Sequence, residues 1–418
     1  MNPRHSYAYL DGVRGWAALM VVYGHFIAAM QPAMLGMGAE RTHFAGDAWL
    51  GQSGLIMLYN PQLAVDVFFV LSGFVLATSV NNRPASFIEL AVRRWVRLGL
   101  PILGTTAMVM PLVNWHLFPA DAAGALTKSD WMLLCYNWSA WPTYPYLTVG
   151  RLFWQSLVAV FINSHMWYNP ALWTMKMEFY GSMGLFAGYT LLPGGFLRRG
   201  GGLLVALVAA GLACKTPLLS PFTYGIALYE VVRLIRQQPE PFRARLARAS
   251  TPGAIVLLLA SLALGGIPYD LDLPDHGFYA RLAEAAWPWV GGLPLLTCRL
   301  SALCLVAAAL LWQPLQRLLM TKPSQWLGRV SFSLYLVHAP ILCALGGWLL
   351  LWLAPLVGYN PATLLVLPMV LAVTLPMAEL IARLLDIPAI RLSRPIGAAA
   401  ADGLRRLLGI RAPVASAH

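Results

Sequence analysis

Long apolar segments along almost the whole chain are the feature that most limits the folds open to this sequence. A helix needs about 20 mostly apolar residues, each rising 1.5 Å, to cross the hydrocarbon core of a bilayer. Segments that reach or approach this length occur at 10–33, 61–80, 98–119, 170–193, 201–215, 217–235, 253–269, 293–312, 330–355 and 361–385. The sequence therefore predicts an all-α polytopic membrane protein with about ten transmembrane helices.

The composition supports a membrane protein and excludes the other broad classes. Only 11% of the 418 residues are charged, whereas soluble domains carry about 25%. The abundance of Trp, Tyr and Phe, 16 of each, excludes a disordered or collagen-like chain. The five Cys show neither a CxxC motif nor metal-ligand spacing, so we expect no bound metal.

The basic residues predict how the chain is oriented. A net charge of +12 on a soluble protein would suggest a nucleic-acid partner. In a membrane protein, Lys and Arg instead gather in cytoplasmic segments. Most of the 29 Lys and Arg fall in cytoplasmic segments when both termini are placed in the cytoplasm. We therefore expect no nucleic-acid partner, a transmembrane domain at 1–390, and a basic cytoplasmic tail at 391–418 that lies on membrane lipid.

The first apolar segment contains three ionisable residues, Asp11, Arg14 and His25. Such groups are costly in a span and are functional candidates by default. Eleven residues separate Arg14 from His25, which is close to a whole number of helical turns, so both side chains share a face about 16 Å apart. Histidine can accept and return a proton near neutral pH. A hydrogen-bonded core residue is the alternative for His25, but group transfer fits a mid-membrane His below a basic entrance better.

The segment AVRRWVRLGLP begins the third predicted helix with Arg93, Arg94 and Arg97. These arginines could anchor the cytoplasmic end of the helix. They could also bind phosphates, which match the forked donors of the guanidinium group. Glu178, inside a later apolar segment, could take part in chemistry or pair with an arginine of another helix.

Two further predicted helices carry polar residues within apolar surroundings. Asp66 and Ser72 lie in AVDVFFVLSGFVLA, and Tyr335 and His338 lie in GRVSFSLYLVHAP. Tyr335 and His338 are three residues apart and are therefore neighbours on a helix. A second intramembrane histidine makes a purely structural role less suitable for either histidine.

Together, these segments resemble the membrane-bound acyltransferase 3 family. The matching blocks are LDGVRGWAALMVVYGHF, DVFFVLSGF, RRWVRLGLP, LWTMKMEFY and VSFSLYLVHAP, in the family's order. The resemblance implies a ten-helix enzyme of the inner membrane, in the stand-alone form without a fused SGNH-type domain. Such an enzyme takes an acyl group, usually acetyl, from cytoplasmic acyl-CoA and places it on a hydroxyl of a glycan, exopolysaccharide or lipid-linked sugar.

The resemblance also implies roles for individual residues. His25 matches the family's essential histidine, Arg94 and Arg97 match its Arg-x-x-Arg pair, and Glu178 matches the acid of a W-x4-E-x-Y-like block. The chain departs from the pattern where Pro101 follows the second arginine by four residues instead of three, and the serine-rich run before the acid is absent. The position of Pro101 predicts that the start of the third helix is shifted relative to the family.

The candidate site residues fall into three groups. The catalytic candidates are His25, Glu178 and Asp11. The candidates for binding the acetyl-CoA donor are Arg14, Arg93, Arg94, Arg97, Ser72, Tyr335 and His338. The candidates for binding the acceptor are Trp138, Trp173 and Asp66.

Two mechanisms fit this set. His25 acts as a general base on the acceptor hydroxyl, or it is itself acylated and passes the group on. Glu178 or Asp11 would orient the imidazole. The competing interpretations are a transporter or flippase, which also places ionisable groups at mid-membrane, and a transferase of succinyl instead of acetyl groups.

Overall fold

The computed structural model describes residues 7–82, 85–136, 148–164, 168–213, 219–267 and 293–409, and these residues form helices and turns without a strand. The longer helices are α1 (Tyr9–Met30), α3 (Pro61–Asn82), α4 (Phe87–Asn114), α9 (Met175–Leu191), α11 (Gly202–Ala213), α12 (Ser220–Arg236), α14 (Ser250–Gly265), α16 (Leu293–Leu311), α18 (Lys322–Ile341), α19 (Gly347–Val357), α20 (Tyr359–Ile381) and α21 (Ile387–Leu407). The chain is therefore all-helical where it is described, as the sequence predicts.

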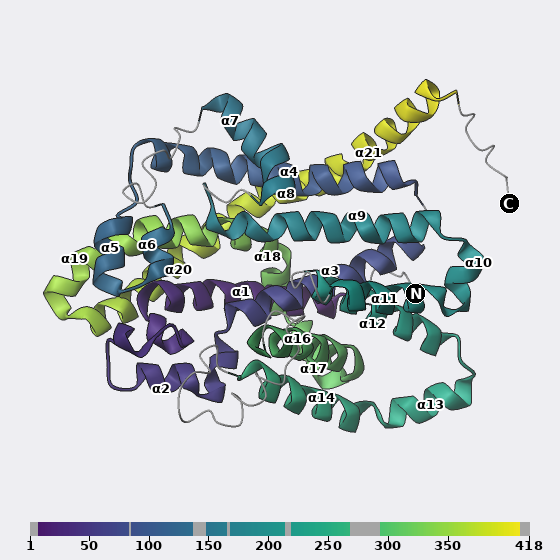
Figure 1. Cartoon of the computed structure of the whole chain (residues 1–418), viewed down its shortest axis with the longest axis horizontal. Coiled ribbons are helices and arrows are strands. Elements are labelled where there is room, and N and C mark those ends of the chain that lie inside the picture. The colour runs from purple at the N-terminus through teal and green to yellow at the C-terminus, as the bar shows by residue number, and fades with distance from the viewer. Residues whose placement is uncertain are drawn as a thin grey trace.

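Short helices connect the long ones. They are α2 (Asp47–Gln52), α5 (Ala120–Thr127), α6 (Asp130–Leu134), α7 (Val149–Trp154), α8 (Val160–Asn163), α10 (Gly194–Phe196), α13 (Glu240–Arg248) and α17 (Gln313–Leu319). In Figure 1, α2, α5 and α6 lie toward one end, whereas α10 and α13 lie toward the opposite end. Single π-helical turns at Gln155–Ala159, Leu197–Gly201, Leu342–Gly346 and Ala382–Asp386, and 3₁₀ turns at Pro32–Leu35, Ala39–Arg41, Gly54–Leu58 and Pro170–Thr174, complete the described helical structure.

Five helical segments are long and apolar enough to cross a membrane, and up to seven if two bent helix pairs each form one span. The bent pairs are α13 with α14, bent by 52°, and α16 with α17, bent by 97°. Each of the ten predicted segments coincides with a helix, but several helices, such as the 12-residue α11 and the 17-residue α12, fall short of the length needed. The protein is a multi-pass membrane protein, and ten crossings remain a prediction.

The start of α4 differs from the sequence prediction. The apolar pattern predicts a span at 98–119 with AVRRWVRLGLP at its cytoplasmic end, but α4 begins earlier, at Phe87. It is capped by the hydroxyl of Ser86, which accepts a hydrogen bond from the backbone N–H of Glu89. Arg93, Arg94 and Arg97 therefore lie within the second and third turns of a 28-residue helix. Charged residues interrupted the apolar pattern without interrupting the helix.

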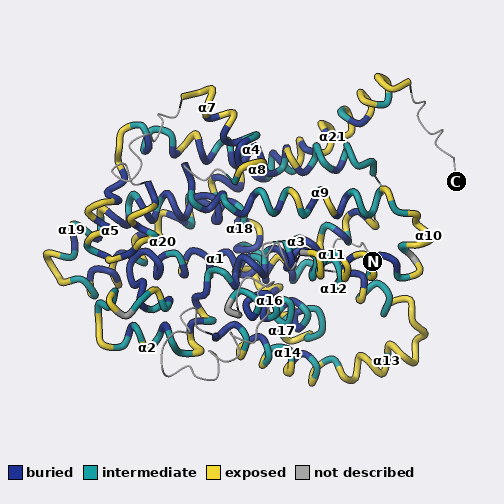
Figure 2. Tube along the Cα trace, in the orientation of Figure 1, coloured by how far each residue is buried: buried dark blue, intermediate teal, exposed yellow. Residues whose placement is uncertain are grey.

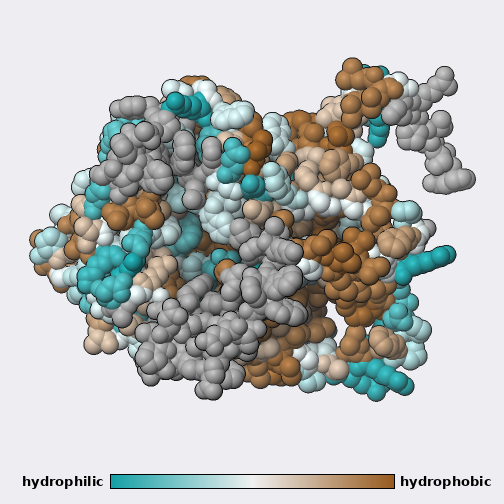
Figure 3. Space-filling model, viewed as in Figure 1, coloured by the Kyte–Doolittle hydropathy of each residue, from teal (hydrophilic) through white to brown (hydrophobic). Residues whose placement is uncertain are grey.

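The outer surface of the bundle carries large apolar side chains. Leu207 and Leu212 on α11, and Val256 and Leu259 on α14, are each more than half exposed. Figure 3 shows apolar side chains gathered over this part of the face, and Figure 2 shows that α1, by contrast, is mostly buried in the interior. A patch of this kind would be unfavourable in water. It is the surface expected where helices face lipid.

The segment predicted to be a basic tail begins within a helix. The predicted boundary at residue 390 falls inside α21, which continues the line of α20 and packs along α4. Gly397 of α21 lies against the side chain of Arg93 and the carbonyl of Glu89. The part of the segment up to Leu407 is thus helical, and the exposed Arg406 lies at its end.

The central helix α1 packs closely against α18. A Cβ atom on Gly15 would collide with the backbone of Leu327 and Gly328, and a Cβ on Gly328 would collide with the backbone of Asp11. Small residues at these positions therefore let the two backbones approach each other, as small residues do between membrane helices. The two helices run in parallel, because residues further along α1 also meet residues further along α18.

Candidate active site

The two intramembrane histidines lie together. His25 Nδ1 is 2.7 Å from His338 Nε2. Gly15 and Gly328, where α1 and α18 approach most closely, each precede one of these histidines by ten residues. Ten residues correspond to about 15 Å along either helix. The glycine contact and the parallel register therefore bring the two imidazoles to the same depth.

His338 is fixed from its own helix. It is fully buried, and its Nδ1 lies 2.7 Å from the carbonyl oxygen of Tyr335 and 3.2 Å from that of Leu334. Pro340 has no backbone N–H, so it leaves the carbonyl of Leu336 without its usual helical donor. The side-chain amide of Asn169 donates to that carbonyl at 2.7 Å. The proline thus gives α18 a docking point for the segment that carries Trp173.

Trp131 contacts His25, and Trp173 lines the same pocket as His25. The Trp131 ring stacks on the imidazole with centroids 5.1 Å apart. Trp173 lines a pocket of about 330 Å³ together with His25, Leu35, Met37, Pro61, Gln62 and Val65. This volume is at the lower end of the range for ligand pockets. His25 is partly exposed, whereas His338 is buried, so His25 is the histidine that a substrate in the pocket can reach.

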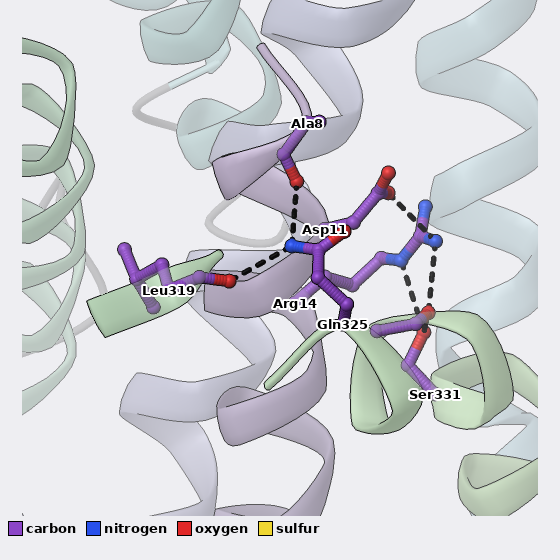
Figure 4. Close-up of polar contacts among 7 residues, drawn as sticks. Ala8, Asp11, Arg14, Leu319, Gln325 and Ser331 are labelled. Atoms are coloured by element: carbon purple, nitrogen blue, oxygen red, sulfur yellow. Dashed lines mark hydrogen bonds and ion pairs between the residues drawn. The ribbon is translucent and has the colours of Figure 1, made fainter. Parts of the chain in front are cut away.

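Arg14 links α1 to α18 about 16 Å from His25 along the axis of α1. Its Nε donates to Ser331 Oγ at 2.9 Å and one terminal nitrogen donates to the carbonyl of Gly328 at 3.0 Å, while Asp11 forms an ion pair with it at 3.0 Å (Figure 4). About a third of the Arg14 side chain remains exposed. Asp11 therefore holds Arg14 and lies far from the imidazole that it was expected to orient.

Arg94 and Glu178 form a buried ion pair between α4 and α9. Ser72 of α3 donates a hydrogen bond of 2.7 Å to the same carboxylate. Of the two alternatives that the sequence left open for Glu178, the structure shows the pairing with an arginine of another helix. Ser72 therefore contacts the ion pair and orients the carboxylate of Glu178.

The remaining donor-binding candidates lie in different surroundings. Arg97 is partly exposed, and its charge interacts with those of Arg94, Arg14 and Asp386. Arg93 pairs with Glu89 at 3.5 Å and faces α21. The structure therefore gathers Arg14, Arg94 and Arg97 into one cluster, which we call the arginine cluster, and directs Arg93 away from it.

Two other candidates have structural partners. The Tyr335 hydroxyl donates to the carbonyl of Ala171 at 2.8 Å and lies 2.9 Å from the Thr174 hydroxyl. Asp66 is buried and accepts a hydrogen bond of 3.2 Å from Gln62. Asp66 therefore does not line the pocket itself, but its hydrogen bond orients Gln62, which does. Trp138 lies outside the described residues.

Several site residues were not identified from the sequence. Gln62 and Asn169 have no distinctive pattern: Gln62 is held by Asp66 of its own helix, and Asn169 gains its place through the carbonyl of Leu336 on a distant helix. Asp386 was hidden in an apolar segment near the end of the last predicted helix. No group of three or more His, Cys, Asp or Glu that could hold a metal ion occurs within the ranges that the structure describes.

Comparison with known proteins identifies the family of the chain. A family model described as an acyltransferase domain matches residues 7–379. The chain is 24% identical to a protein named Acyltransferase R4 from Phoma sp., over 86% of this chain and 87% of that protein. It is 25% identical to O-acetyltransferase PaAT-1 from Phomopsis amygdali, over 82% of this chain and 73% of that protein. No solved structure shows significant similarity. The family match confirms the resemblance seen in the sequence: the chain belongs to the membrane-bound acyltransferase 3 family, and it is an acyltransferase.

Proposed function

We propose that this acyltransferase moves an acetyl group from cytoplasmic acetyl-CoA to a hydroxyl of an acceptor, with His25 at the reacting centre. The observation that carries the proposal is the arrangement on α1, where His25 lines a pocket while Arg14 joins the arginine cluster about 16 Å away along the same helix. The name of one relative, an O-acetyltransferase, supports acetyl as the transferred group. We place the protein in the inner membrane with both termini in the cytoplasm.

The arginine cluster suits the phosphate end of the donor. Guanidinium groups bind phosphate through paired hydrogen bonds and keep their charge inside a protein. Arg97 and Arg14 retain exposed surface, whereas Arg94 is buried against Glu178. With the phosphates held there, the extended pantetheine arm carries the thioester toward the depth of His25.

The pocket suits the acceptor. Among its described lining residues, only His25, Gln62 and Trp173 carry side-chain hydrogen-bonding groups, and the other four are apolar. A hydroxyl buried without a hydrogen-bond partner costs about 1–3 kcal/mol, so this lining disfavours a bare polysaccharide, in which every sugar unit brings several hydroxyls. Of the acceptors that the family resemblance implies, a lipid-linked sugar fits better, because it brings an apolar portion with it.

The chemistry follows one of two routes. In direct transfer, His25 takes the hydroxyl proton, the acceptor oxygen attacks the thioester carbonyl, the carbon–sulfur bond breaks, and the proton passes to the leaving thiolate. In the second route, the imidazole attacks first and releases CoA, and the acceptor oxygen then takes the acyl group from the histidine. Both routes yield an ester and free CoA.

Release of the CoA thiol tests the proposed function. Purified protein should release thiol from acetyl-CoA, and release should rise when a membrane lipid extract that contains lipid-linked sugars is added. Faster release from succinyl-CoA would identify the alternative donor. Absence of release from either donor, with or without the extract, would favour the transporter or flippase interpretation.

Replacing Arg97 tests the donor site. Because the guanidinium contributes to phosphate binding, Arg97→Ala should raise the KM for acetyl-CoA by about tenfold or more, equivalent to about 1.4 kcal/mol. Arg97→Lys should restore the KM only in part, since Lys cannot make the forked contact. The matched control is Arg405→Ala, which removes a partly exposed arginine paired with Asp402 near the end of α21. Equal KM values for all four proteins would assign Arg97 to membrane topology alone.

A further inference from the structure

The contact between the two imidazoles determines which nitrogen of His25 can react. We propose that His338 is a positioning residue that fixes the tautomer of His25, so that Nδ1 carries the hydrogen and Nε2 presents its lone pair to the pocket. This inference rests on the proposed role of His25 as the group that accepts the proton or the acyl group. His338 itself is buried beneath His25 and is absent from the lining of the pocket.

The hydrogen positions follow from the partners of His338. Its Nδ1 faces two backbone carbonyl oxygens, of Tyr335 and Leu334, and a carbonyl oxygen can only accept a hydrogen bond. Nδ1 of His338 must therefore carry a hydrogen, and in a neutral ring its Nε2 is then an acceptor. The contact of 2.7 Å requires a donor on the other side, which is the Nδ1–H of His25. The remaining nitrogen of His25, Nε2, is left with its lone pair.

The geometry of the contact is that of a directed hydrogen bond. The two ring planes are within 14° of each other and the centroids are 5.0 Å apart. With the facing nitrogens at 2.7 Å, the rings meet edge to edge in nearly one plane, so the N–H of one ring points along the lone pair of the other. Trp131 stacks on the face of His25, which hinders rotation of the ring out of this plane.

A neutral partner suits this position better than a carboxylate. In soluble hydrolases an aspartate commonly holds the catalytic histidine in the correct tautomer and stabilises its charged form. A carboxylate is expensive in the middle of a membrane unless it is paired. The two acids that could have served, Asp11 and Glu178, are paired with Arg14 and Arg94 instead. An imidazole supplies the same acceptor without adding a charge.

The pair formed by His25 and His338 also determines the path of the proton during transfer. In the direct route, the proton of the acceptor hydroxyl moves to Nε2 of His25, and the resulting positive charge strengthens the existing hydrogen bond from Nδ1 to His338. The proton then leaves from Nε2 to the sulfur of CoA. His338 gains no proton that it must pass on, because its own Nδ1–H already faces backbone carbonyls.

The test compares two replacements of His338. His338→Leu removes the acceptor and should lower kcat about 100-fold, with the KM for acetyl-CoA changed less than about twofold, since the donor's phosphates bind elsewhere. His338→Gln retains an acceptor oxygen near the former Nε2 and should recover at least about tenfold of the loss. Ser333→Ala is the matched control on α18, because the buried Ser333 hydroxyl has no hydrogen-bond partner among the residues that the structure describes. It should behave as the wild type.

Thermal unfolding of each variant in detergent separates positioning from folding. If His338→Leu is folded and retains most of the wild-type kcat, the inference is overturned. If it does not fold, the Gln variant decides: activity within about tenfold of the wild type supports the inference, and activity as low as that of His25→Ala overturns it. A fully active His25→Ala variant would instead overturn the proposed role of His25, on which the inference rests.

Discussion

Replacing His25 with Ala should reduce acyl transfer about 1,000-fold or more, while binding of acetyl-CoA stays the same. General acid–base catalysis contributes about 10²–10⁴ to a rate, and a nucleophile that is lost removes its route altogether. His25 lines the pocket, and the arginine cluster lies about 16 Å away, so the change should appear in kcat and leave the KM for the donor unaffected. The measurement is steady-state release of CoA, combined with equilibrium binding of a non-hydrolysable acetyl-CoA analogue.

A neighbouring replacement on α1 controls for damage to the helix. Tyr23 is exposed two residues before His25, and Tyr23→Phe removes only its hydroxyl. This variant should retain wild-type activity. Substantial turnover by His25→Ala, in a preparation that binds the analogue normally, would show that His25 is structural and that both proposed routes are wrong.

Replacing Glu178 should produce the largest loss of stability. Glu178 and Arg94 are about nine-tenths buried and form an ion pair, and removing one partner leaves the other charge buried without compensation. Breaking a buried pair in this way costs about 3–5 kcal/mol, whereas replacing both partners with apolar residues is often neutral. We therefore expect Glu178→Met and Arg94→Met to lower the free energy of unfolding strongly, and the double variant to recover most of the loss.

Denaturant unfolding of the four proteins in a mild detergent measures this coupling as a double-mutant cycle. The same proteins separate a structural role of Glu178 from a catalytic one. The stable double variant should retain some turnover with a raised KM for acetyl-CoA, because the imidazole and its pocket are intact. If the single variants are as stable as the wild type, the ion pair does not stabilise the fold as described. If the double variant is folded but shows no turnover, Glu178 is a catalytic residue.

The sequence predicts those parts of the fold that depend only on the length of the apolar segments. The long segments that became α1 and α3 stand out, because their side chains are almost all compatible with lipid or a protein core. The start of α4 could not be predicted, because Arg93, Arg94 and Arg97 resemble the edge of a membrane span although the helix continues through them. Whether short helices such as α11 cross the membrane depends on their packing against neighbours, which apolar length does not express.

The candidate site divides in a similar way. The shared face of Arg14 and His25 follows from helical period alone and could be read from the sequence. The partner of His25 could not be predicted from the sequence. His25 and His338 are 313 residues apart, and only the packing of α1 on α18 brings them together. A signal was present in the matching positions of Gly15 and Gly328, each ten residues before a histidine, but it becomes meaningful only once the two helices are known to pack in parallel.

The most direct test of this account follows the acyl group itself. Purified protein in lipid nanodiscs receives acetyl-CoA labelled in the acetyl group, together with a membrane extract that contains lipid-linked sugars, and the products are separated and counted. The account predicts that the label appears in an ester of an extract component, in step with the release of CoA, and that His25→Ala produces neither. Release of CoA with all the label recovered as free acetate, or transfer of label that is unaffected in His25→Ala, would contradict it.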